Sequence, residues 1–149
     1  MPLITDPSTI LPGLATAIAT VLATVPGLKV YAYEPVDIDV RPAATVEGPI
    51  ELTRTEPERG ESQLGAWDWL STWAVRIYVD LMEADAAESQ IRGLLGQVVA
   101  AFDEDRSLGG AVLDSSLVRS ARNYSGRDEA HLNQMVLYEC ELRVWSLVQ

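Results

Sequence analysis

Two segments far apart in the chain alternate apolar and polar side chains, and this pattern constrains the fold most. The segments are residues 69–80 and about 132–148. Their apolar positions are Trp73, Val75, Ile77 and Val79 in the first, and Val136, Tyr138, Cys140, Leu142 and Val144 in the second. A period of two is typical of a β-strand with one buried face. The chain therefore needs a sheet with one face covered by other elements.

The first covering element is predicted near the N-terminus. Residues 7–28 contain no charged side chain, and Thr16, Thr20 and Thr24 recur every fourth residue on one helical face. This spacing predicts an amphipathic helix over about residues 11–25 rather than a membrane span or signal peptide. The opposite face is apolar and contains Ile10, Leu14, Ile18, Val21, Leu22 and Val25.

The ends of this helix are predicted from its flanking residues. Ser8 or Thr9 is expected near the start, with Pro12 in the first turn, where backbone N–H groups have no helical acceptor. Pro26 and Gly27 are expected to end the helix. Proline cannot continue the hydrogen-bond ladder, and glycine tolerates a left-handed backbone.

A second helix is predicted from apolar residues at helical spacing. Asp85 and Glu88 have the spacing of a capping box in which Asp replaces the usual Ser or Thr. Gly93 and Gly96 each cost about 1 kcal/mol relative to alanine inside a helix, which favours close approach of another backbone there. The apolar positions are Ala87, Ile91, Leu94, Leu95, Val98, Val99 and Phe102.

The remaining segments predict shorter strands and turns. Gly48-Pro49 is expected to break one strand from the next, and residues 108–110 and 125–128 are expected to form turns. Residues 55–66 are polar and unpatterned, which predicts an exposed loop. The shorter strands are expected at residues 28–33, 43–46, 50–54 and 113–124.

Together these elements predict a single α+β domain over residues 1–149. Their order is α-β-β-(β)-β-α-β-β, with neighbouring strands joined by turns running antiparallel. The sheet is expected to have about four to five strands, with both helices packed on one face.

Composition favours a binding or assembly protein over an enzyme. The 149 residues carry a formal charge of −11, which argues against sequence-independent binding to DNA or to an anionic membrane. Cys140 is the one cysteine and is expected in the core, so a disulfide framework and a zinc ribbon are excluded. His131 is the one histidine and is expected at a turn or surface. We therefore expect no catalytic residues, metal or cofactor.

One acidic segment resembles a calcium-binding loop only loosely. Asp103, Asp105, Ser107 and Asp114 fall at four ligand positions of an EF-hand. Leu108 occupies the position that needs glycine, and the last ligand is Asp rather than the bidentate Glu. A solvated acidic helix end is the favoured interpretation.

Tryptophans and a charged loop are the candidate interface residues. The tryptophans either pack in the core or fill subunit interfaces, where aromatic side chains dominate the binding energy. The last strand is long, so its far end is also expected to pair with a neighbouring subunit. The candidate subunit or partner residues are Glu58, Arg59, Glu61, Trp67, Trp69 and Trp145.

Taken in order, the chain resembles the tail terminator, or tail-completion, proteins of long non-contractile-tailed bacteriophages. The resemblance covers nearly all of the chain and includes no catalytic motif. The segments that carry it are residues 25–31, Pro35, residues 41–46, 73–79, 84–85, 108–110 and 138–144.

This resemblance implies a ring, usually of six subunits, on the last ring of the tail tube. The ring stops polymerisation of the major tail tube protein and provides the docking surface for a head–tail connector or head-completion protein. DNA is then only cargo passing through an acidic lumen, and the protein belongs to the virion neck. Whether the loop at residues 55–66 orders on assembly is left open by the sequence. The alternatives are another head–tail neck component, or a small ligand-binding or enzymatic α+β domain.

Overall fold

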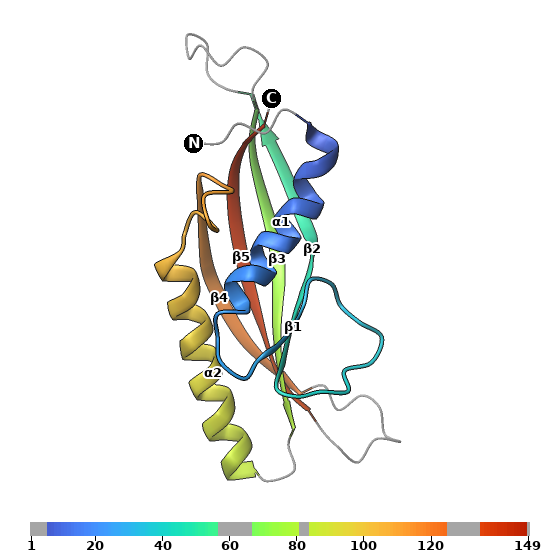
Figure 1. Cartoon of the computed structure of the whole chain (residues 1–149), viewed down its shortest axis with the longest axis vertical. Coiled ribbons are helices and arrows are strands. Elements are labelled where there is room, and N and C mark those ends of the chain that lie inside the picture. Colours follow the sequence, from blue (N-terminus) through green and yellow to red (C-terminus); the bar gives the residue numbers. More distant parts are fainter. Residues whose placement is uncertain (1–5, 57–66, 81–83, 125–134, 149) are drawn as a thin grey trace.

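The computed structural model describes residues 6–56, 67–80, 84–124 and 135–148, and it confirms the α+β class (Figure 1). Within these ranges, two helices and five strands form one sheet in the order β1-β2-β3-β5-β4. The elements are α1 (Pro7–Leu22), β1 (Lys29–Tyr31), β2 (Ala43–Thr55), β3 (Trp67–Asp80), α2 (Ala84–Glu104), β4 (Asp114–Tyr124) and β5 (Met135–Val148).

The sheet is antiparallel except at one edge. β3 pairs with β2 on one side and with β5 on the other, both antiparallel, and β4 is antiparallel to β5. β1 pairs parallel to β2, so the expectation of antiparallel neighbours is wrong there. The physical reason is the long connection over residues 32–42, which returns the chain to the same end of the sheet before β2 begins.

β2 is one strand rather than the two short strands expected. Its pairing with β3 continues past Gly48-Pro49 to Thr55, with a register irregularity between Glu47 and Glu51. Gly48 adopts a φ of 152°, which side chains rarely adopt. The break predicted from Gly48-Pro49 is therefore a bulge that leaves the strand continuous.

Replacing Gly48 with alanine is expected to lower the free energy of unfolding by about 1–3 kcal/mol. A Cβ atom at this position would lie 2.9 Å from Cε3 of the buried Trp73 side chain, and the backbone conformation is strained for alanine. Urea denaturation measures the loss. Gly93→Ala is the control, because no atom of the described residues outside α2 lies within 4 Å of a Cβ there. We expect that helical substitution to stabilise the chain by up to about 1 kcal/mol.

α1 begins earlier than its sequence pattern predicts. Asp6 is the N-cap, and its carboxylate accepts hydrogen bonds from the Ser8 N–H at 3.0 Å and the Ser8 hydroxyl at 2.7 Å. The helix therefore starts at Pro7, and Pro12 lies inside it rather than in its first turn. The predicted end at residue 25 is also late, since α1 ends at Leu22; Gly27 does adopt the left-handed conformation expected of it, with a φ of 75°.

α2 begins with Ala84, so Asp85 lies inside its first turn and the predicted capping box is wrong. The Glu88 carboxylate instead accepts hydrogen bonds from the Arg122 guanidinium of β4, one of them at 2.9 Å. These hydrogen bonds lower the pKa of Glu88. Among the described residues, nothing outside α2 lies within 4 Å of a Cβ atom built at Gly93 or Gly96, so the close backbone approach expected there is not found.

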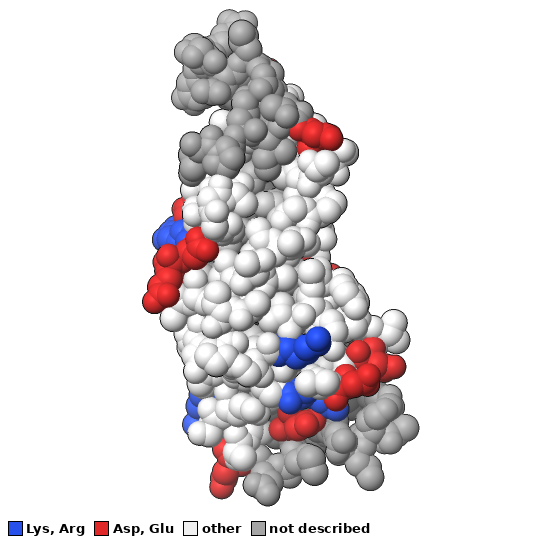
Figure 2. Space-filling model, in the orientation of Figure 1, with Lys and Arg blue, Asp and Glu red and all other residues white. Residues whose placement is uncertain are grey.

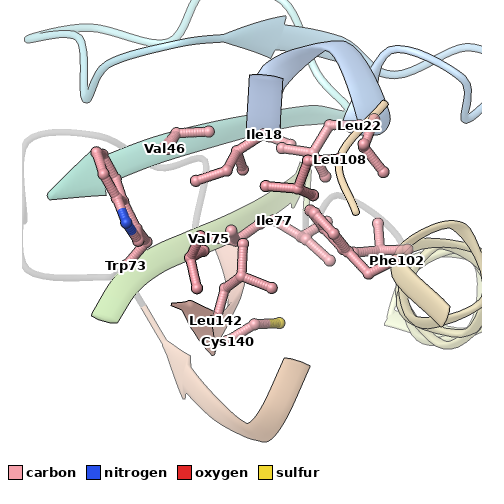
Figure 3. Packing of buried hydrophobic residues seen from close by; sticks show 14 of the residues in the cluster. Ile18, Leu22, Val46, Trp73, Val75, Ile77, Phe102, Leu108, Cys140 and Leu142 are labelled. Carbon is pink, nitrogen blue, oxygen red and sulfur yellow. The ribbon is translucent and has the colours of Figure 1, made fainter. Parts of the chain in front are cut away.

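Both helices cover the same face of the sheet, as predicted (Figure 1). Figure 3 shows Leu22 of α1, Ile77 of β3 and Phe102 of α2 converging in the core between them. The apolar faces predicted for α1 and for the two alternating strands are buried there. Neither helix in the described ranges is long and apolar enough to cross a membrane.

Candidate assembly surface

The other face of the sheet carries neither helix, and we call it the open face. The strand register shows which residues lie on the open face, because residues paired directly across neighbouring strands point to the same face of the sheet. Carboxylates outnumber guanidinium groups among its strand residues. The carboxylates are Glu47, Glu51, Asp68, Asp80, Asp114, Glu139 and Glu141, and the guanidinium groups are Arg76, Arg119 and Arg143.

The helix-bearing side has a different character. Figure 2 shows an uncharged area over its middle, with charged side chains along its edges and across its lower part. α1 contributes no charged residue to this side, since the stretch from Pro7 to Leu22 has none. α2 does carry charge on this side, with Asp85, Glu88, Asp103 and Glu104 against Arg92, so the uncharged surface is that of α1 rather than of the whole side.

Arg76 is the centre of an ion-pair cluster on the open face. Its guanidinium lies 2.9 Å from the Glu139 carboxylate of β5, 3.0 Å from Glu47 of β2 and 3.7 Å from Glu34. Burial alone would lower the pKa of Arg76, but the hydrogen bonds to Glu139 and Glu47 outweigh it and raise the pKa. One side chain thus links β2, β3, β5 and the connection between β1 and β2.

Glu34 fastens that connection to the sheet. One carboxylate oxygen accepts a hydrogen bond from the Tyr78 hydroxyl, and the other accepts one from the Thr45 hydroxyl. Near the end of the same connection, Arg41 lies 3.0 Å from the Asp80 carboxylate. Residues 32–42 are therefore held against β2 and β3 by charged contacts rather than by apolar packing.

Tyr78 gives this attachment a pH dependence. Burial, followed by the hydrogen bond to Glu34, raises the pKa of Tyr78 above its ordinary value of 10.0. The unfolded chain therefore ionises first, and stability is lost as the pH rises above about 10. We expect the unfolding free energy of Tyr78→Phe to fall less steeply between about pH 9 and about pH 11 than that of wild type.

Denaturant titrations at several pH values measure this slope. Tyr33→Phe is the control, because the Tyr33 side chain is exposed, and it should keep the wild-type slope. Equal slopes for Tyr78→Phe and wild type would contradict the assignment.

A depression of about 220 Å³ lies on the open face between β2 and β4. Ile50 of the β2 bulge and Arg119 of β4 line it at opposite sides, with Glu139 and Glu141 of β5 between them. Glu141 pairs with Arg143 at 3.0 Å. Arg119 is exposed and has no ion-pair or hydrogen-bond partner among the described residues.

The structure separates the tryptophans that were grouped as interface candidates. Trp69 is buried in the core, and the half-buried Trp67 packs against it on the helix-bearing side. The Arg54 guanidinium stacks 4.5 Å from the Trp67 ring centre and 5.3 Å from the Trp69 ring centre. Trp145 is half-buried on the open face, opposite Leu70 of β3. Trp67 and Trp69 therefore form one aromatic cluster with Arg54, and Trp145 lies apart from it.

β5 is an interior strand except at its far end, where Ser146–Val148 pair with β3 but not with β4, so the expected pairing with a neighbouring subunit there stays a prediction. It pairs with β3 over its whole length and with β4 from Val136 to Trp145. The outer edges of the sheet are β4 on one side and, on the other, the short β1 together with the part of β2 beyond Thr45. The loop candidates Glu58, Arg59 and Glu61, and also His131, lie outside the described residues.

The acidic helix end forms a turn held by its own side chains. The Asp105 carboxylate accepts hydrogen bonds from the Gly109 N–H at 2.9 and 3.0 Å, and Arg106 pairs with Asp114 at 2.8 Å. The part of the chain that the structure describes holds no group of three or more His, Cys, Asp or Glu side chains arranged for a metal ion. Cys140 is buried as predicted, and burial raises the pKa of its thiol.

No protein-family model matches the chain, and no curated protein sequence matches it. A function for this chain must therefore rest on its own residues and surfaces.

Proposed function

We propose that this chain is a structural virion protein that forms a ring, of six subunits, at the head-proximal end of a phage tail tube. The ring ends tube polymerisation and offers the surface onto which the head–tail connector docks. The ordered resemblance to tail terminator proteins suggests this role. The charge distribution of the fold is the observation that carries it.

That charge distribution suits a ring through which DNA passes. The strand residues of the open face comprise seven carboxylates and three guanidinium groups, whereas α1 on the opposite side has no charged residue (Figure 2). Subunits whose open faces point toward the ring axis would line the lumen with carboxylates. Like-charge repulsion from the phosphates then keeps DNA from adhering to the wall. At −11 per chain, six copies carry a formal charge of −66.

Polymerisation of the tail tube tests this proposal directly. The major tail tube protein of the same phage is assembled with and without this chain, and tube lengths are measured by electron microscopy. We expect shorter tubes with a cap of extra density at one end. An unrelated acidic protein of similar size is the control for charge. Tubes of unchanged length with two uncapped ends would contradict the proposal.

A further inference from the structure

β2 and β4 each leave a backbone edge without a partner strand among the described residues. β1 pairs with β2 only at Ala43–Thr45, so the outer edge of β2 from Val46 to Thr55 faces no strand that the structure describes. At the other side of the sheet, β4 pairs only with β5. A free edge presents unpaired N–H and C=O groups, which favours the addition of another strand.

The two free edges carry opposite charges on the open face. Arg119 of β4 is exposed, and no described residue pairs with it. Glu51 of β2 is also exposed and also lacks a partner in the described ranges. Glu47, on the same strand, is 45% exposed despite its contact with Arg76. The β2 edge is thus acidic where the β4 edge has an uncompensated cation.

Strand direction and register make these edges complementary. β2 and β4 run in opposite directions, because each of the three strand pairs between them is antiparallel. Across the sheet, Glu47 pairs with Ala74, Ala74 with Glu141, and Glu141 with Arg119, so Glu47 and Arg119 lie at one level. Two copies at equal height would therefore join antiparallel and bring Arg119 of one copy beside Glu47 of the next, close to Glu51. This pairing is limited to Asp114–Arg119 of β4, because β1 already covers Ala43–Thr45, which lie at the level of Ala121–Asn123.

Irregularities on both edges restrict which strand can be added. β2 has its bulge between Glu47 and Glu51, where Pro49 lacks an N–H group, and β4 has a register shift between Leu117 and Arg119. Such features limit the length of regular pairing and disfavour unrelated strands. A second copy of this chain also supplies the charge that each edge lacks.

We propose that copies of this chain associate edge to edge, with β4 of one copy against β2 of the next and Arg119 facing the carboxylates of Glu47 and Glu51. The contact joins two different surfaces, so repetition closes a ring where the rotation permits. The helices then lie outside and the acidic open faces line the lumen. Closure into a ring rests on the proposed function, whereas the edge contact itself needs only a second copy.

Charge reversal with rescue tests the contact. The association of the full chain is measured by analytical ultracentrifugation over a range of concentrations, both alone and in the presence of tail tubes. We expect Arg119→Glu to weaken association at least about tenfold, because like charges then face each other across the edge. The double variant Arg119→Glu with Glu51→Arg should recover part of the loss, because Glu51 lies beside position 119 while Glu47 still faces it. Arg92→Glu, which reverses a 75% exposed charge on α2, is the matched control and should associate like wild type.

Circular dichroism first confirms that each variant is folded. Association of Arg119→Glu equal to wild type, failure of the double variant to recover, or a wild-type chain that stays monomeric alone and on tubes would each overturn the edge contact. Normal association with the expected charge-reversal pattern, but no effect on tube length, would uphold the edge contact and contradict only the tail terminator function.

Discussion

Replacing Trp73 with alanine lowers the free energy of unfolding by about 3–5 kcal/mol. Trp73 is 1% exposed and lies in the core between the sheet and the helices (Figure 3). Its Nε1–H donates a hydrogen bond of 2.8 Å to the buried Ser71 hydroxyl, which would lose this donor. The substitution also removes the ring that packs against Gly48. Urea denaturation followed by circular dichroism measures the change.

Trp145→Ala is the control for the loss of an indole ring. Trp145 is half-buried on the open face, so its replacement leaves no enclosed cavity. We expect the free energy of unfolding to fall by at most about 2 kcal/mol, toward the low end of the losses caused by truncating apolar side chains. Equal losses of unfolding free energy for Trp73→Ala and Trp145→Ala would contradict the placement of Trp73 in the core and of Trp145 outside it.

Replacing Arg76 with leucine is expected to lower the free energy of unfolding by about 1–3 kcal/mol, as much as Gly48→Ala. Removal of one member of a fully buried ion pair costs about 3–5 kcal/mol. The lower value applies here because the Arg76 side chain is 17% exposed and the carboxylates of Glu47 and Glu139 are 45% and 50% exposed. Leucine leaves three carboxylates facing one another without a cation. Denaturant unfolding near neutral pH measures the loss.

Two further variants separate charge from position in this cluster. Arg76→Lys retains the charge but lacks the planar guanidinium that reaches several carboxylates. Its free energy of unfolding should therefore lie between those of wild type and Arg76→Leu. Arg143→Leu removes a single exposed pair with Glu141, worth about 0–1 kcal/mol. A loss at Arg143 as large as that at Arg76 would contradict a central role for the cluster.

The local patterns of the sequence predict most of the core. The alternation around Trp73 identifies β3 and its buried face, because a period of two depends only on neighbouring residues. The same holds for the apolar face of α1. The start of α1 could also have been read correctly, since Asp6 directly precedes Pro7, and Asp before a first-turn proline is a preferred helix start.

The candidate surface could not be predicted in the same way. Arg76 gathers Glu34, Glu47 and Glu139, which come from a connection and two different strands. No local spacing relates these residues, and only the sheet register brings them together. The free edges depend on the parallel pairing of β1 with β2 and on the interior position of β5, which are non-local properties as well. The alternating pattern does predict that Arg76 lies on the polar face of β3.

The measurement that tests the central claim most directly is electron microscopy of a lysate from the phage that encodes this chain, with its gene deleted. A tail terminator predicts overlong tails without heads, beside heads filled with DNA, and restoration of normal tails when the gene is supplied in trans. Tails of normal length beside unattached heads would contradict termination and move the protein to the head side of the neck. Normal infectious particles would contradict any role in tail assembly.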